Sequence, residues 1–143
     1  MNGALEALRE VYQEALETGR RLLQYAETHY DPSACQDPER LGQILDGREE
    51  LIQALAAQDA KASTLLRGLA DEGQALPEYI KDLQKELRDT LDAVRRRDEA
   101  LAEGARASLE ALKARTLKAR ESGKIARYLG ETPQTGRNID LSR

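Results

Sequence analysis

Three long stretches of this chain place mostly apolar residues at intervals of three and four positions. That spacing puts one apolar stripe along a helix and is typical of helices that pack lengthwise against each other. The first stripe comprises Leu5, Leu8, Tyr12, Ala15, Gly19, Leu22 and Ala26, the second Leu41, Leu45, Arg48, Ile52, Leu55, Asp59, Ala62, Leu66 and Leu69, and the third Ile80, Leu83, Leu87, Leu91, Val94, Asp98, Leu101, Ala105, Ser108 and Leu112. The sequence therefore predicts three long helices.

The composition fits helices that share a thin apolar seam better than it fits a compact globule. The 143 residues include no Trp and no Phe, and 34% of them are charged. A globule of this length normally buries large aromatic side chains, whereas long helices can pack through Leu and Ala. We therefore expect an all-α fold, an elongated antiparallel three-helix bundle with a partly irregular C-terminal tail.

Turn-forming residues mark the ends of the predicted helices. Asp37 is placed to cap the second helix, with Pro38 at its first position. Gly73 is a suitable stop for that helix, and Pro77 opens the third. We expect a helical domain over residues 1–121, followed by a helix end and a flexible tail over residues 122–143.

Small and polar residues interrupt the stripes. Gly19 is expected to let a neighbouring helix approach closely. For Arg48, Asp59 and Asp98 two interpretations stay open. Polar seam residues can select one alignment of the helices at a cost in stability, or they can lie at the seam edge and reach water.

The three helices are predicted to differ in length, which affects what each stripe can bury. With short antiparallel connections, the third helix extends past the others by roughly ten residues, around positions 112–122. At the opposite end, the first helix is expected to stop short and to leave one group of side chains uncovered. This group comprises Leu65, Leu66, Leu69, Ile80, Leu83 and Leu87. Exposed stripes of this kind bind other helices or cause dimerisation.

The residues that carry catalysis or bind metals are scarce. His29 is the single histidine and Cys35 the single cysteine, and their spacing matches no zinc pattern. No glycine-rich phosphate loop occurs in the sequence, and no window is apolar enough to span a membrane. The N-terminal residues carry acidic groups where a signal peptide needs an apolar run. We expect a soluble cytoplasmic protein that is not an enzyme and needs no cofactor or metal.

The charges are distributed unevenly along the chain. From Lys113 onward there are eight Lys and Arg against three Asp and Glu, whereas the preceding residues are strongly acidic. Basic runs can bind nucleic acid, but this one has no interleaved aromatic side chains to stack on bases, and the acidic remainder would repel phosphates. We therefore expect no nucleic-acid partner.

The C-terminal residues are too apolar for a discarded tail, since Tyr128, Leu129 and Ile139 lie among basic and turn-forming residues. Three short motifs occur in this region: Gly123-Lys124, Tyr128-Leu129-Gly130 and Ile139-Asp140. With these motifs after long helices rich in Leu and Glu, the chain resembles the bacterial flagellar export chaperones of the FlgN type. The chain departs from the family pattern in having Leu129 between the Tyr and the Gly.

This resemblance implies a function. Chaperones of the FlgN type are all-helical cytosolic proteins. They bind the helical C-terminal regions of hook-associated proteins, which form the hook–filament junction, prevent their premature assembly and deliver them to the flagellar type III export gate. A tyrosine near the C-terminus of such chaperones is implicated in docking on the gate's cytosolic domain. By match to the motif, Tyr128 is the docking residue here, and the apolar residues Leu129 and Ile139 are expected to belong to the same docking tail.

The third helix supplies candidates for the cargo site. Leu101, Leu109 and Leu112 lie on the part of that helix expected to be least covered. The alternative for each is that it belongs to the core of the bundle or of a homodimer. A coiled-coil scaffold or dimeric interaction protein would show the same three stripes, and a nucleic-acid-binding helical protein is a third alternative.

Overall fold

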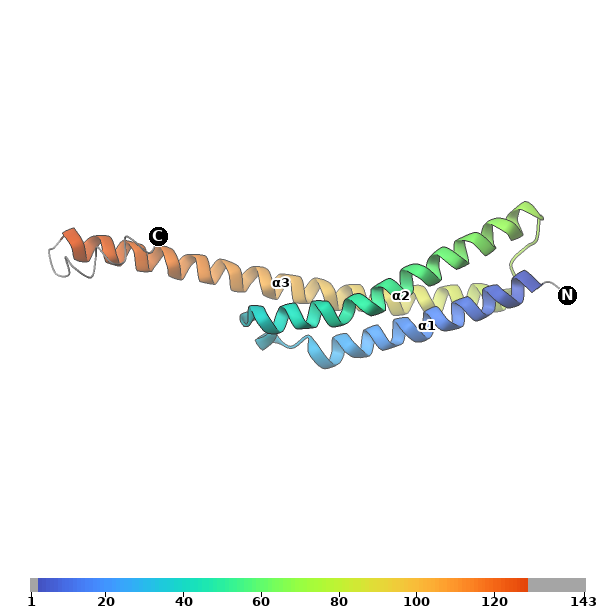
Figure 1. The fold of residues 1–143 in the computed structure, drawn as a ribbon, viewed down its shortest axis with the longest axis horizontal. Coiled ribbons are helices and arrows are strands. Elements are labelled where there is room, and N and C mark those ends of the chain that lie inside the picture. The colour runs from blue at the N-terminus through green and yellow to red at the C-terminus, as the bar shows by residue number, and fades with distance from the viewer. Residues whose placement is uncertain (1–2, 129–143) are drawn as a thin grey trace. The chain divides into compact units, whose positions relative to one another are not determined.

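The computed structural model describes residues 3–128 of the chain, with side chains described as far as Ile125. The elements are α1 (Gly3–His29), the 3-10 helix η1 (Pro32–Gln36), α2 (Pro38–Asp71) and α3 (Glu78–Tyr128) (Figure 1). No strand occurs within this range, and the fold is all-α as predicted. The chain forms two compact units, Met1–Gly104 and Ala105–Arg143. The boundary expected at residue 121 separates a helical domain from a helix end and tail, and not two compact units, so it stays a prediction.

Within the first unit, α1 lies antiparallel to α2 and parallel to the beginning of α3. Tyr25 donates a hydrogen bond to the Ile44 carbonyl (2.8 Å), and Gln58 Nε2 donates to Thr18 Oγ1 (3.1 Å). Residue numbers therefore fall along α1 as they rise along α2. Gln84 of α3 donates to the Tyr12 hydroxyl (3.0 Å), and further along both helices Arg97 forms an ion pair with Glu27 (3.9 Å).

The predicted start and end of α2 are confirmed, and α3 begins directly after Pro77. The Asp37 side chain caps α2 by accepting a hydrogen bond from the Arg40 amide at 3.3 Å, and Pro38 occupies the first turn. Gly73 has φ +70°, a conformation that costs glycine little. Its amide donates to the Ala70 carbonyl, and the Gln74 amide donates to the Leu69 carbonyl. These two bonds form a Schellman motif, which satisfies carbonyls that the end of α2 would otherwise leave unpaired.

The core of the first unit is continuous to the end where α2 connects to α3. Its largest fully buried side chains are those of Leu8, Leu22, Leu69 and Ile80. One cluster brings together Leu8, Val11, Tyr12, Ala62, Leu69 and Ile80, with Leu65, Leu66, Leu83 and Leu87 packed against it. The prediction that α1 leaves this end uncovered is therefore wrong.

The connector between α1 and α2 explains that error. It is not a symmetrical turn, because η1 lies beside the first turn of α2, where Arg40 forms an ion pair with Asp31 and a hydrogen bond with Ser33. The first turn of α2 is thus occupied by the connector and not by α1. This shifts α1 toward the α2–α3 connection, where Leu8 packs in one cluster with Leu69 and Ile80. The excess length of α2 is at its beginning.

The beginning of α2 differs from the predicted stripe in one further respect. Leu45, a predicted seam residue, is 44% exposed, whereas its neighbour Ile44 is buried. Ile44 also provides the carbonyl that accepts the Tyr25 hydrogen bond. The side chain that enters the core is therefore one position away from the one that strict heptad spacing selects.

Two glycines of the bundle lie against neighbouring side chains. A Cβ on Gly19 would lie 3.4 Å from Thr90 Cγ2, which is ordinary van der Waals contact and places α3 directly against α1, as predicted. Gly47 is closer to its neighbour, since a Cβ there would lie 3.0 Å from Tyr25 Cζ and nearer still to the hydroxyl. Gly42, in the same helix, has nothing within 4 Å of such an atom.

We expect Gly47→Ala and Gly42→Ala to change stability in opposite directions. Alanine favours a helix over glycine by up to about 1 kcal/mol, and Gly42→Ala should gain this in full. In Gly47→Ala the new methyl group displaces the Tyr25 ring and its hydrogen bond, so we expect a net loss of about 1 kcal/mol. Urea unfolding followed by circular dichroism measures both. A similar gain for the two variants would contradict the close approach of Tyr25.

Candidate functional site

The three predicted cargo residues lie in two different environments. Leu101 is 8% exposed and belongs to the first unit, where its carbonyl accepts a hydrogen bond from the Cys35 thiol (3.6 Å). Leu109 and Leu112 lie in the second unit and are 49% and 53% exposed. For Leu101 the alternative of a bundle core residue holds, and its assignment to an exposed cargo surface is corrected. Leu109 and Leu112 are accessible to a partner.

The helical segment 105–125 carries further exposed apolar side chains. Leu117 and Ile125 are 57% and 60% exposed, and every residue from 109 to 122 is exposed. A spacing of three and four residues also occurs along one face of this segment, which we call the docking face, in a register that takes Leu109 where the predicted stripe takes Ser108. It comprises Ala105, Leu109, Leu112, Thr116, Ala119 and Gly123. Leu117 and Ile125 lie off this face, which is why stripe analysis missed them, although their hydrophobicity alone could have indicated them.

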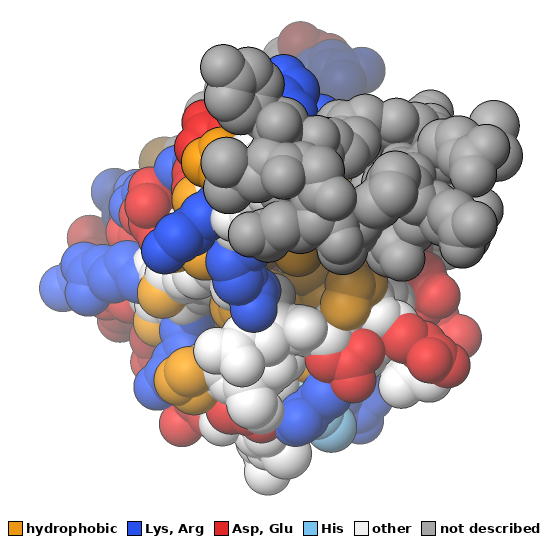
Figure 2. Space-filling view, turned by 90° about the vertical axis from the view of Figure 1, so that its left-hand side faces the viewer, with side chains coloured by type: hydrophobic (Ala, Val, Ile, Leu, Met, Phe, Trp, Pro, Cys, Tyr) orange, Lys and Arg blue, Asp and Glu red, His pale blue; other side chains and the backbone are white. Residues whose placement is uncertain are grey.

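Basic side chains lie along one edge of the docking face. Lys113 and Arg120 are seven residues apart, which places both on the same side of the helix, and both are exposed. Lys113 forms an ion pair of 3.7 Å with Glu110, in which both side chains are more than half exposed. Such a pair contributes little and leaves the charge accessible. Figure 2 shows basic and hydrophobic side chains side by side on the surface turned toward the viewer.

The predicted export-gate residues lie at or beyond the end of the described range. Tyr128 is the last residue of α3. Leu129 and Ile139 lie outside the described residues. The role of all three in docking stays a prediction.

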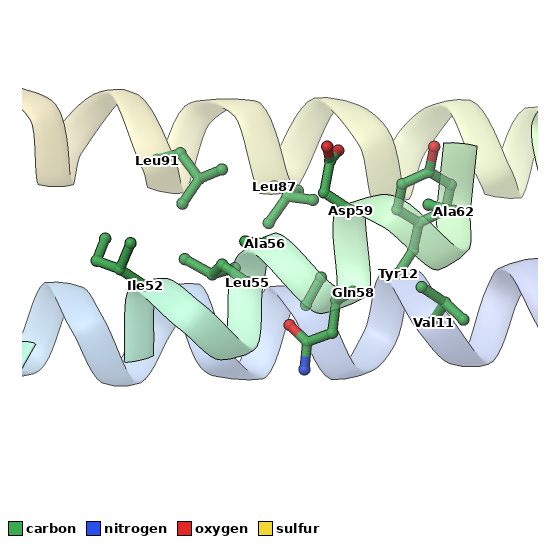
Figure 3. A pocket seen from close by; sticks show the side chains of 11 residues that line it. Val11, Tyr12, Ile52, Leu55, Ala56, Gln58, Asp59, Ala62, Leu87 and Leu91 are labelled. Atoms are coloured by element: carbon green, nitrogen blue, oxygen red, sulfur yellow. The ribbon is translucent and has the colours of Figure 1, made fainter. Parts of the chain in front are cut away.

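An apolar pocket of about 300 Å³ lies between the three helices of the first unit (Figure 3). Its lining comprises Val11, Tyr12, Ala15, Ile52, Leu55, Ala56, Gln58, Asp59, Ala62, Leu87 and Leu91. Asp59 is the one acidic or basic residue in this lining. Gln58 donates to Thr18, while its buried Oε1 has no partner. Asp59, a polar member of the second predicted stripe, is thus exposed beside this pocket.

The other two polar stripe residues form a network between α2 and α3. Arg48 Nη2 lies 2.7 Å from Asp98 Oδ2, and the Tyr30 hydroxyl donates to Asp98 Oδ1 at 2.7 Å. Burial and the hydrogen bond to Asp98 raise the pKa of Tyr30 to about 12. Burial works against the Arg48 charge, but Asp98 and Tyr30 outweigh it and raise the pKa of Arg48. Arg48 and Asp98 are therefore paired with each other and do not simply reach water.

The described residues contain neither a metal site nor a membrane-spanning helix by the usual criteria. No three His, Cys, Asp or Glu side chains within this range come close enough together to hold a metal ion. His29 instead packs its ring against Tyr25, with 4.4 Å between ring centroids. None of the helices in this range combines the length and the apolar character needed to cross a membrane. Comparison of the chain with protein-family models, curated proteins and solved structures gives no match.

Proposed function

We propose that the protein is a chaperone that binds amphipathic helices of other proteins through the docking face. The observation that supports this is the exposure of Leu109 and Leu112, each about half accessible on one face of a long helix. Exposed apolar side chains at heptad spacing are suited to a partner helix, whose own apolar stripe would cover them. The site needs no catalytic group for such a function, since holding and releasing a helix is a binding process.

The resemblance to the FlgN type suggests the cargo and the destination. The cargo would be the terminal helices of flagellar hook-associated proteins, which the chaperone would keep from assembling before it delivers them to the export gate. Tyr128, Leu129 and Ile139 would then contact the cytosolic domain of the gate. This division places cargo binding and gate docking on successive parts of the chain. Both processes belong in the cytoplasm.

The second candidate function is that of a coiled-coil scaffold in which the docking face joins two copies of the chain. The same exposed leucines favour it, because a homodimer would bury them equally well. The molar mass in solution distinguishes the two candidates. A dimer that dissociates when Leu109 and Leu112 are replaced would support the scaffold.

The test of the proposed chaperone function is co-purification with hook-associated proteins encoded in the same genome. Leu109→Asp with Leu112→Asp should abolish a one-to-one complex, because two carboxylates would be buried against the apolar stripe of the cargo. Ala111→Asp with Ala114→Asp is the matched control, since it adds the same charge to exposed positions off the docking face. Leu101 is left intact because its replacement would disturb the core. A folded protein that captures no hook-associated protein would overturn the proposal.

A further inference from the structure

The flanks of the docking face have a charge pattern of their own. In heptad terms, Leu109 and Thr116 occupy a positions, and Leu112 and Ala119 occupy d positions. The e positions are then Arg106, Lys113 and Arg120, and the g positions are Ser108, Arg115 and Ser122. The e flank is thus basic throughout, and neither flank carries an acidic residue. The two acidic residues of this segment, Glu110 and Glu121, lie at b and f positions, away from the seam.

This pattern disfavours pairing of the docking face with a second copy of itself. In a parallel pair, the e residues of one helix lie opposite the g residues of the other. Arg120 would then lie near Arg115 of the second copy, and Lys113 near Ser108. In an antiparallel pair, e residues face e residues, and every such contact would join two cations. Like charges placed opposite each other oppose association and serve to exclude a wrong partner.

The docking face is also poorly suited to a lipid surface. Beyond Leu112 its residues are Thr116, Ala119 and Gly123, which offer little apolar area for insertion between lipids. Small residues instead allow the backbone of a second helix to approach closely. A Cβ on Gly123 would meet nothing within 4 Å, so no packing among the described residues requires glycine there.

We infer that the docking face takes an amphipathic helix whose own flanks are acidic. This inference rests on the proposed function and names the chemistry of the cargo helix. Acidic residues on the partner would lie opposite Lys113 and Arg120, while its apolar stripe covers Leu109 and Leu112. The charges then select the partner and speed the encounter, and the leucines supply most of the contact area. The same charges that recruit this helix keep two chaperones apart.

Two synthetic peptides test the inference on the full-length protein. Both are three-heptad helices with Leu at every a and d position, and they differ only in having Glu or Lys at every e and g position. We expect the Glu peptide to bind about ten-fold more tightly at low salt, measured by fluorescence anisotropy, and the difference to shrink at 1 M salt, where the screening length is about 3 Å. Equal affinity for the two peptides would overturn the inference.

Charge reversal on the protein provides the complementary arm. Lys113→Glu with Arg120→Glu should reverse the preference toward the Lys peptide. Lys61→Glu with Lys118→Glu is the matched control, because it changes the net charge equally at exposed positions away from the e flank, and it should leave the preference intact. Binding to vesicles of anionic lipid but to neither peptide would also overturn the inference. So would self-association of the unsubstituted protein at micromolar concentration, if Leu109→Asp with Leu112→Asp abolishes it.

These outcomes separate the inference from the proposed function. If hook-associated proteins bind and the Lys113→Glu, Arg120→Glu variant binds them equally well, the inference fails and the chaperone function stands. If the Glu peptide is preferred but no hook-associated protein is captured, the flagellar function fails and the inference about the docking face stands.

Discussion

Leu69→Ala should lower the free energy of unfolding by about 3 kcal/mol, whereas Leu112→Ala should change it by less than about 0.5 kcal/mol. Both residues are predicted stripe leucines, and the chemical change is identical. Leu69 is 1% exposed within the cluster that includes Leu8 and Ile80, so its truncation leaves a cavity. Leu112 is 53% exposed, and its truncation removes atoms that already contact water.

Urea unfolding followed by circular dichroism at 222 nm measures both effects at one protein concentration. A loss of about 3 kcal/mol is a large part of the stability of a small domain, which is typically about 5–15 kcal/mol. A large loss for Leu112→Ala would show that this side chain is buried in solution, as it would be in a homodimer. Repeating the titration at higher protein concentration would then reveal a concentration-dependent midpoint.

The contrast between these leucines shows what stripe analysis can and cannot predict. The heptad pattern correctly identifies a face of α3 that is buried or half-buried from Ile80 to Leu101. It does not show where that face stops being buried, because Leu101 and Leu112 both belong to the predicted stripe. Leu101 is 8% exposed and Leu112 is 53% exposed, and only the side chains around them account for the difference. Burial depends on where the other helices end. That in turn depends on the connector, whose 3-10 helix beside α2 leaves no heptad signal.

The helix boundaries were predictable for a local reason. Asp37-Pro38 and Gly73 act through hydrogen bonds and backbone conformation within a few residues, so the sequence alone contains the necessary information. The pairing of Arg48 with Asp98 is not local, and it was missed. It could have been found by counting outward from the turn near Ala75. Arg48 and Ala102 are the same number of residues from Ala75, so two antiparallel helices joined there would place them side by side. Ala102 is one helical turn from Asp98.

The second large effect is expected when this pair is broken. Asp98→Asn should cost about 1–3 kcal/mol, less than the 3–5 kcal/mol typical of fully buried pairs, because the Arg48 and Asp98 side chains are 23% and 30% exposed. The loss arises because Arg48 keeps its charge without a partner, while its Nε is already buried without a hydrogen bond. Arg48→Met alone should be costly for the same reason, since it leaves the Asp98 carboxylate with the Tyr30 hydrogen bond but without its cation.

A local readout shows whether the network itself has been changed. Burial raises the pKa of Tyr30, and the hydrogen bond to Asp98 and the charge of Asp98 raise it further, to about 12. Asp98→Asn removes the charge, so the pKa of Tyr30 should fall. Absorbance of the phenolate near 295 nm follows this titration, and Tyr30→Phe identifies which step belongs to Tyr30. A step that stays at the same pH in Asp98→Asn would contradict the hydrogen bond.

Replacing the whole network separates stability from helix alignment. The triple variant Tyr30→Phe, Arg48→Met, Asp98→Leu removes every polar partner together, so no charge is left unpaired, and its stability should lie within about 1 kcal/mol of the natural protein or above it. If the network fixes the alignment of α2 against α3, the triple variant should keep its stability but show broadened amide resonances from exchange between alignments. Sharp resonances together with unchanged stability would show that apolar packing alone sets the alignment. The single Asp98→Asn loss would then measure only the cost of isolating the Arg48 charge.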